Sequence, residues 1–302
     1  MRTALRFLRV FLLGLAVIAT GSAQARKLKV LISVDMEGVA GVVSADQLSP
    51  GSFEYERFRR FMTAEAIAAV EGAKQAGATE IVVTDAHGNE QNLLVELFPA
   101  DVRIVRGSPR RLGMMGGLDA SFDAAMFVGY HASTHNSNGV RAHTFSSARF
   151  TRLTVNGAEV TEGAWNAAVA GHFGVPVIFV SGDDAAVAEV RAAIGPISAV
   201  ETKRTLGFHS AETITPEASQ KLIREKAAAA IGELRQRKPY KVTEPVTVAV
   251  SFKSITPVEA ASYLKQVFTR VDSHTLRFAA KDMAEATEIL QFLMTYRLEL
   301  EP

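Results

Sequence analysis

Short apolar segments alternate with amphipathic ones through the first two-thirds of this chain of 302 residues. The apolar segments have the length and the Val- and Ile-rich composition of buried β-strands, and each ends at polar or turn-forming residues. The stretches between them repeat their apolar positions with the period of a helix. Predicted strands lie within residues 28–38, 80–85, 102–105, 124–130 and 175–180, and predicted helices cover 55–75 and 161–173. The alternation predicts an α/β fold with a largely parallel or mixed central sheet flanked by helices.

From about residue 196 the pattern changes. Two predicted helices each begin at a Thr-Pro pair, which is typical of a helix N-terminus. Predicted elements here are helices at 215–235, from 256 and at 281–296, and an alternating strand at 246–252. No low-complexity linker separates this part from the rest. We therefore predict an integrated α+β C-terminal subdomain of about residues 196–302 beside an α/β core of about residues 26–195.

A further strand and hairpin are predicted in the middle of the chain. Residues 143–155 show β-type alternation, and Asn156-Gly157 follows them. Asn-Gly is the dipeptide that most favours a two-residue β-hairpin turn. The stretch therefore predicts a strand followed by a tight hairpin.

Residues 1–25 have the three parts of a secretory signal peptide. Three arginines precede an apolar run from Val10 to Thr20, and Ala23-Gln24-Ala25 forms an A-x-A cleavage site. An uncleaved anchor helix is the alternative, but the apolar run is short for a membrane span. We therefore predict cleavage after Ala25, a mature domain of residues 26–302, and a periplasmic or secreted protein with no membrane segment after cleavage.

Composition limits the chemistry that the mature chain can perform. Cysteine is absent, which excludes disulfides, a thiolate nucleophile and a cysteine-based zinc site. Loss of three arginines with residues 1–25 leaves 30 basic and 32 acidic side chains, a net charge of −2. This near-neutral balance gives no basis for binding nucleic acid or an anionic membrane. Catalysis must therefore use histidines, carboxylates, hydroxyls or a metal.

Acidic residues and histidines follow three of the predicted strands. Asp35 and Glu37 come at the end of the first strand, His87 follows the second, and His131 follows the strand at 124–130. Ligands bind outside the carboxyl ends of the strands in open α/β sheets, so these side chains are expected to share one site. Two neighbouring carboxylates repel each other unless a cation lies between them. Carboxylate and imidazole ligands without a thiolate suit Zn²⁺, with Mn²⁺ or Co²⁺ as alternatives.

Six segments of the chain resemble the M55 metallopeptidases, a family of D-aminopeptidases. They are SVDMEGVAGV, TDAHGNEQNL, FVGYHA, RAHTFS, EGAWNAAVAG and FAAKDMAEA, and they span nearly all of the mature chain in family order. The resemblance implies a two-zinc enzyme that releases N-terminal D-amino acids from short peptides such as D-Ala-D-Ala. It also implies a ring-like homo-oligomer, which is a decamer in the type member of the family.

The resemblance further implies a role for each residue that matches a family motif. The metal ligands of the family correspond here to Asp35, Glu37, His87, His131 and Glu162. The proposed catalytic histidine corresponds to His143 in RAHTFS. His135 lies in the same loop, but the residues around it do not match the family pattern.

These residues suffice for a hydrolytic mechanism. The five ligands can hold two zinc ions if one carboxylate bridges them, and we select Asp35 for the bridge. Zinc lowers the pKa of its bound water toward about 7 and polarises a carbonyl group. We expect His143 to act as general base, or as acid toward the leaving amine, with direct attack by the imidazole as the alternative. Asn92 and Asn166 are candidates for substrate binding, although Asn92 also suits a helix cap.

Two other functions fit part of the pattern. A metal-dependent phosphoesterase would use the same types of ligand, but Arg141 is the only basic residue close to a motif. A periplasmic peptide-binding protein would fit an exported α/β chain, but it would not need five candidate ligands and a further histidine. A zinc-dependent aminopeptidase acting on short peptides is therefore the function that the sequence favours.

Overall fold

The computed structural model describes residues 27–296. The predicted signal peptide, residues 1–25, lies outside the described residues. Within the described range, no helix combines the length and the apolar character that a membrane crossing requires.

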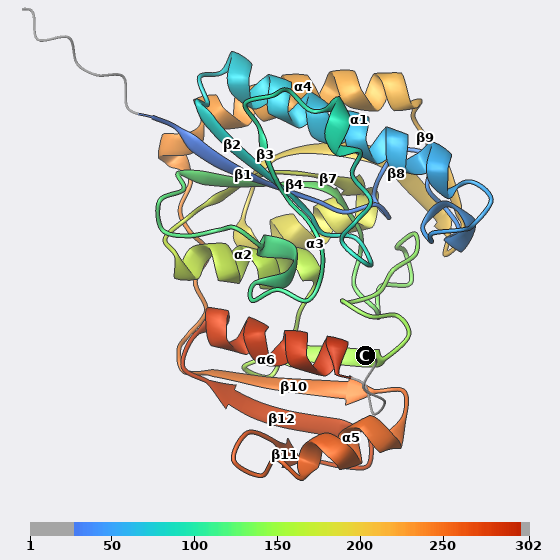
Figure 1. The fold of residues 1–302 in the computed structure, drawn as a ribbon, viewed down its shortest axis with the longest axis vertical. Coiled ribbons are helices and arrows are strands. Elements are labelled where there is room, and N and C mark those ends of the chain that lie inside the picture. The colour runs from blue at the N-terminus through green and yellow to red at the C-terminus, as the bar shows by residue number, and fades with distance from the viewer. Residues whose placement is uncertain (1–26, 297–302) are drawn as a thin grey trace, which may run out of the picture.

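Sheet A forms the centre of the molecule and has seven strands in the order β3-β2-β1-β4-β7-β8-β9 (Figure 1). Its strands are β1 (Lys29–Val34), β2 (Glu80–Asp85), β3 (Arg103–Val105), β4 (Ala124–Tyr130), β7 (Val177–Asp183), β8 (Ser198–Gly207) and β9 (Ser210–Thr213). Neighbouring strands are parallel except for the antiparallel pair β8 and β9. The strands β1, β2, β4 and β7 are buried almost throughout, so they read as continuous apolar runs in the sequence. The predicted mixed sheet is confirmed.

Helices cover both faces of sheet A (Figure 1). The helices α1 (Tyr55–Gln75) and α4 (Pro216–Gly232) pack together on one face, and α2 (Glu162–His172) and α3 (Asp184–Ile194) lie on the other. Successive residues of β1 point to opposite faces: Ile32 joins the core under α1 and α4, whereas Leu31 joins the core under α2.

A second sheet, sheet B, is antiparallel and has the strand order β11-β12-β10-β5-β6. Its strands are β5 (Phe150–Val155), β6 (Ala158–Glu159), β10 (Val246–Phe252), β11 (Thr269–Arg270) and β12 (Thr275–Ala280). The helix α6 (Met283–Thr295) lies between sheet B and the rest of the molecule, and α5 (Ile255–Ser262) lies beside β11 (Figure 1). Trp165 of α2 connects the two parts, because its indole Nε1 donates a hydrogen bond of 3.0 Å to Thr287 Oγ1 of α6.

Each sheet contains strands from both predicted parts of the chain. Sheet B takes β5 and β6 from before residue 196, and sheet A takes β8 and β9 from beyond it. The predicted α+β C-terminal part is therefore interleaved with the α/β core. The boundary near residue 196 stays a prediction.

Two predicted boundaries in this region are wrong. The strand predicted from His143 begins only at Phe150, because residues 143–149 form turns closed by hydrogen bonds such as Phe150 N to Ser146 O at 2.9 Å. The helix predicted from the Thr-Pro pair at 256–257 starts one residue earlier, with Ser254 as N-cap. The Asn156-Gly157 turn is confirmed, since both residues have positive φ and join β5 to β6.

The strand order places the carboxyl ends of β2, β1 and β4 side by side. From β1 the chain adds β2 and β3 on one side of the sheet and then β4 and β7 on the other, so the strand order reverses at β1. Ligands bind at such a reversal in open α/β sheets. Two glycines let the chain pack closely at this edge: a Cβ on Gly129 would lie 2.3 Å from Asp35 O, and one on Gly38 would lie 2.1 Å from Tyr130 O. Gly129 also has a φ of +73°, which side-chain-bearing residues rarely adopt. The close approach brings the segments after β1 and β4 together.

Candidate metal centre

Four predicted ligands converge at the carboxyl ends of β2, β1 and β4. Nδ1 of His87 lies 2.9 Å from Glu37 Oε2 and 3.3 Å from Asp35 Oδ1. Nε2 of His131 lies 3.4 Å from Asp35 Oδ2. None of the four residues is more than 7% exposed. Asp35 therefore presents one carboxylate oxygen to each of the two histidines.

Glu162 and His143 complete the cluster from outside sheet A. Glu162 is the first residue of α2, after Thr161, whose hydroxyl caps the helix by accepting from Ala164 N at 2.9 Å. Its Oε2 lies 3.3 Å from His131 Nε2, and its Oε1 lies 3.9 Å from His143 Nε2. Oε1 also accepts a hydrogen bond from Phe145 N, in the turns that carry His143. All six residues predicted as ligands or catalytic group are thus brought together.

Each of the three imidazoles has one nitrogen bound to a backbone carbonyl. His87 uses Nε2 toward Leu48 O at 2.8 Å, His131 uses Nδ1 toward Ala132 O at 3.0 Å, and His143 uses Nδ1 toward Arg141 O at 2.9 Å. A carbonyl can only accept, so each of these nitrogens carries the proton. The other nitrogen then faces the carboxylates with a free lone pair when the ring is neutral. Such contacts fix the tautomer and orientation of histidines that bind metals.

Burial sets the charge balance of the cluster. Burial, together with the neighbouring carboxylate of Glu37, raises the pKa of Asp35 to about 8. Burial alone would also raise the pKa of Glu37, but the adjacent His87 holds it well below its ordinary value. Although burial opposes it, Glu37 raises the pKa of His87, and Glu162 in the same way raises the pKa of His131. Three buried carboxylates at this spacing therefore require positive charge among them.

The cluster fits a divalent metal. Asp35 Oδ2 and His131 Nε2 are buried and have no hydrogen-bond partner in the described structure. Two groups of three residues each bring their ligating atoms within 4.8 Å of one another, and both groups include His131. The first group also contains Asp35 and Glu37, and the second contains His143 and Glu162. Carboxylate oxygens and imidazole nitrogens without sulfur are ligands that Zn²⁺ accepts. The second group contains His143, whose position thus suits a metal ligand as well as a base.

A cavity of about 400 Å³ opens onto the cluster. All six residues of the cluster contribute to its wall, together with the turns at 145–148 and with Gln291, Met294 and Thr295 of α6. This volume suits a small ligand. The C-terminal helix therefore forms one side of the space that a substrate would enter.

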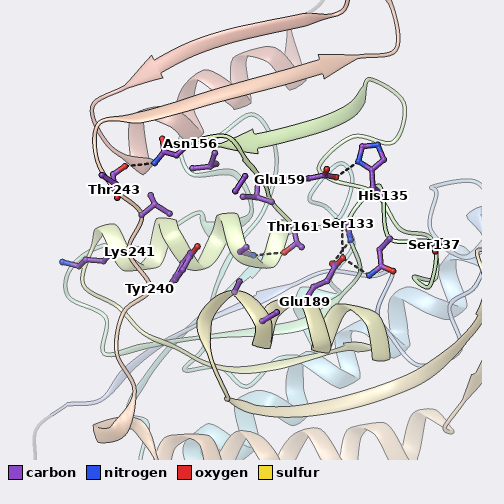
Figure 2. Close-up of a pocket in the computed structure, with 18 residues that line it drawn as sticks. Ser133, His135, Ser137, Asn156, Glu159, Thr161, Glu189, Tyr240, Lys241 and Thr243 are labelled. Carbon is purple, nitrogen blue, oxygen red and sulfur yellow. Dashed lines mark hydrogen bonds and ion pairs between the residues drawn. The ribbon is translucent and has the colours of Figure 1, made fainter.

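A larger cavity of about 870 Å³ lies apart from this cluster, and none of the six cluster residues lines it. Figure 2 shows its polar groups paired with one another: Glu189 accepts hydrogen bonds from Ser133, and Glu159 lies against His135. Because both carboxylates that line it already have partners within the protein, we do not assign the reaction to it. His135, the other histidine of the loop after β4, is thus placed outside the candidate metal centre.

Asn92 holds the segment that carries His87. Its Oδ1 accepts from Tyr55 Oη at 2.7 Å, and its Nδ2 donates to Asp85 Oδ1 at 2.9 Å and to His87 O at 2.6 Å. Asn92 borders the cavity but is only 1% exposed. Its predicted contact with a substrate stays a prediction. The carboxylate of Asp85 binds Asn92 and Leu93 N, which fixes the same turn.

Asn166 lies one turn into α2, beneath the cluster. Its Nδ2 donates to Tyr130 Oη at 3.0 Å and approaches Met114 Sδ at 3.2 Å. It does not appear among the residues that line the 400 Å³ cavity. Its observed contacts are thus with the protein interior, and a role in substrate binding stays a prediction.

Lys203 of β8 supports the site but was not among the residues predicted from the sequence. Its Nζ donates to three backbone carbonyls of the turn that contains Glu37: Glu37 O, Val39 O at 2.9 Å and Val42 O at 2.7 Å. The lysine is 2% exposed. Because β8 also contains Glu201 and Arg204, no signal in the sequence distinguishes this lysine from its charged neighbours.

Comparison with known proteins shows the family to which the chain belongs. The model of the peptidase family M55, described as D-aminopeptidase, matches residues 28–292. The D-aminopeptidase of Bacillus subtilis (strain 168) is 32% identical over 265 residues, which cover 87% of this chain and 95% of that protein.

A solved structure has the same fold. It is that of the Zn-dependent D-aminopeptidase DppA from Bacillus subtilis, a self-compartmentalizing protease. The TM-score is 0.84 at 30% sequence identity, and the match covers 90% of this chain and 100% of that one.

Proposed function

Because the chain belongs to the M55 family of D-aminopeptidases, we propose that it is a zinc-dependent aminopeptidase that releases N-terminal D-amino acids from short peptides. The observation that carries the proposal is the buried cluster of three carboxylates and three imidazoles at the carboxyl edge of sheet A. The Bacillus subtilis relative, a Zn-dependent D-aminopeptidase, supports zinc as the metal and D-residues as the specificity.

We propose two metal positions that share Asp35. Asp35 Oδ1 faces His87 at 3.3 Å, and Asp35 Oδ2 faces His131 at 3.4 Å. One position would then use Glu37 and His87, and the other would use His131 and Glu162. Two metal ions held by these residues would supply the paired positive charge that two-metal hydrolases use.

The mechanism that we propose assigns the proton transfers to His143. Bound zinc supplies a polarised scissile carbonyl and a water of lowered pKa. The Nδ1 proton of His143 is held by Arg141 O at 2.9 Å, so Nε2 has a lone pair available on the side of Glu162. The neutral imidazole can take a proton from the attacking water and deliver it to the leaving amine. Direct attack by the imidazole is the second route, and it would give a burst of released amine.

The cavity supports a peptide rather than a phosphate ester as substrate. Arg141 is the one Lys or Arg among the described residues that line it. Phosphoryl-transfer sites commonly add several Arg or Lys side chains to their metal ions, and this cavity offers one. The same catalytic set argues against a protein that only binds peptides.

The location and the assembly of the protein are further proposals. The signal-peptide pattern of residues 1–25 supports a periplasmic or secreted enzyme. The description of the Bacillus subtilis relative as a self-compartmentalizing protease supports a homo-oligomer, and a decameric ring is the form that we propose. N-terminal sequencing of the exported protein and light scattering of the purified protein would test the two statements.

The experiment that tests the proposed function combines metal analysis with a substrate screen. Purified protein should contain close to two zinc ions per chain, and chelation should abolish activity that added zinc restores. It should hydrolyse D-alanine p-nitroanilide and D-Ala-D-Ala far faster than their L-enantiomers. Metal-free protein that binds peptides without cleaving them, or cleavage of phosphate esters instead, would reject the proposal.

A further inference from the structure

Arg141 occupies an unusual position beside the candidate metal centre. It lies two residues before His143, and its backbone carbonyl accepts the hydrogen bond that orients the His143 ring. Its φ is +54°, in the left-handed region that non-glycine residues seldom adopt. Its backbone N donates to Phe208 O at 3.0 Å, at the turn of the β8–β9 hairpin. Strained residues of this kind persist where the surrounding structure fixes them, often at functional sites.

The guanidinium group of Arg141 has no acidic partner in the described structure. No carboxylate of residues 27–296 lies within ion-pair distance of it, and its Nε is buried without a hydrogen bond. The aromatic ring of Phe208 lies 5.3 Å from the guanidinium carbon. Packing against an aromatic ring fixes the group while leaving its hydrogen-bond donors free.

Arg110, on the same side of sheet A, shows the usual alternative. Its guanidinium pairs with Glu90 at 3.3 Å and donates to the carbonyls of Gly113 at 2.7 Å and Asp85. Its charge is therefore paired within the protein. Arg141 borders the catalytic cavity, as the only Lys or Arg among the described residues of its wall, and its charge is uncompensated.

We propose that Arg141 binds the free α-carboxylate of the substrate, so that the enzyme is selective for peptides with one residue after the scissile bond. This proposal rests on the proposed aminopeptidase function. In a dipeptide, two covalent bonds separate the leaving nitrogen from the carboxylate carbon. His143, which protonates that nitrogen, and Arg141 lie on one short segment at the cavity wall. The planar guanidinium can bind a carboxylate through two parallel hydrogen bonds.

The size and charge of the cavity agree with this assignment. A volume of about 400 Å³ is small for a long peptide and suits a ligand of dipeptide size. The remaining charged residues of the wall are the groups of the metal centre and Glu90, so Arg141 is the lysine or arginine side chain that a substrate carboxylate can reach there.

The test compares two substrates that differ only in the carboxylate: D-Ala-D-Ala and its C-terminal amide. Wild-type protein should prefer the acid in kcat/KM. In Arg141→Met the acid-to-amide ratio of kcat/KM should fall about tenfold to a hundredfold, because a hydrogen-bonded charge pair is lost. Arg141→Lys should restore part of the ratio, since it keeps the charge but not the planar fork.

A control variant separates this role from a general effect of charge. Arg204→Gln removes an exposed arginine from β8, the strand that leads into the same hairpin, and should leave the ratio unchanged. An acid-to-amide ratio in Arg141→Met equal to that of wild type would overturn the proposal for Arg141 while leaving the aminopeptidase function intact. Wild-type protein that cleaves neither substrate would instead reject the aminopeptidase function itself.

Discussion

The imidazole rings of His131 and His143 are stacked, with their centroids 4.1 Å apart and 10° between their planes. Burial, and then the neighbouring His131, lowers the pKa of His143 below its ordinary value. The carboxylates around His131, above all Glu162, instead raise the pKa of that ring. Because the pKa of His143 is lowered, its ring is neutral near pH 7 and able to accept a proton.

Replacing His143 tests this assignment. His143→Ala should lower kcat by about 10²- to 10⁴-fold, the usual contribution of a positioned acid–base group. Zinc content should stay close to that of wild type, because the remaining ligands are in place. Steady-state kinetics and elemental analysis of the same preparation would measure both.

The matched control is His135→Ala, eight residues earlier in the same loop. His135 is 54% exposed and pairs with Glu159 at the other cavity, so its loss should leave kcat near the wild-type value. Wild-type rates in His143→Ala, or loss of zinc from it, would show that its role as the base is wrong. In the second case His143 would be a ligand.

Asp35→Ala should release metal. The residue contributes an oxygen toward each of the two proposed positions, so its loss removes a ligand from both. We expect zinc per chain to fall by at least half, with activity below detection even at added zinc. Asp46→Ala removes an exposed acid from a nearby turn and should change neither quantity. Full zinc content in Asp35→Ala would contradict the bridging role.

Lys203→Met should destabilise both the fold and the centre. Three carbonyls of the turn around Glu37 would lose their donor, and each buried unsatisfied group costs about 1–3 kcal/mol. Urea unfolding should show a loss of at least about 3 kcal/mol, and competition with a chelator should show faster release of zinc. Lys221→Met, on the exposed side of α4, is the control. Equal stability of Lys203→Met and the control would mean that the turn does not depend on this lysine.

Glu65 predicts a pH dependence of stability that is separate from the metal centre. Its Oε1 accepts from Ala40 N at 3.0 Å and Ser219 Oγ at 2.7 Å, whereas its Oε2 is buried without a partner. Burial raises the pKa of Glu65 from 4.5 to about 7. Between these two values the folded protein binds more protons than the unfolded chain. The stability that the protonated group contributes is therefore fully present below pH 4.5 and is lost as the pH rises through about 7.

Glu65→Gln keeps an acceptor for both hydrogen bonds and cannot ionise. It should match wild type in free energy of unfolding at pH 5 and exceed it at pH 8 by about 1–3 kcal/mol. Glu56→Gln, on the exposed side of α1, should give the same small difference at both pH values. Denaturant unfolding at the two pH values measures this, and a pH-independent difference for Glu65→Gln would contradict the raised pKa.

The central sheet and the ligands could be predicted because their signals are local. Buried strands such as Ala124–Tyr130 are apolar along their whole length, and each ligand follows such a strand or begins a capped helix. The hairpin of β8 and β9 could not be found in this way. Its strands are partly exposed at the edge of sheet A, and they contain charged residues such as Arg204 and Glu212.

Contacts that form only in the assembled fold also could not be predicted from the sequence. Lys203 reaches Glu37 O across 166 positions of the chain, and Arg141 meets Phe208 only through the same hairpin. The strand predicted from His143 was wrong because alternation alone cannot distinguish a strand from turns whose hydrogen bonds close on themselves. The residue types of the site were visible, but the groups that orient them were not.

Because each sheet contains strands from both parts of the chain, the order in which the sheets fold has a consequence for the enzyme. The loop that carries His143 is anchored at one end by β4 in sheet A and at the other by β5, which pairs with β10. The segments with Asp35, Glu37, His87 and His131 all precede β10 at 246–252 along the chain. A partly folded chain in which sheet A forms first can thus assemble the first half of the centre while His143 and Glu162 lack their final support. The enzyme would stay inactive until sheet B is complete and α6 closes the cavity.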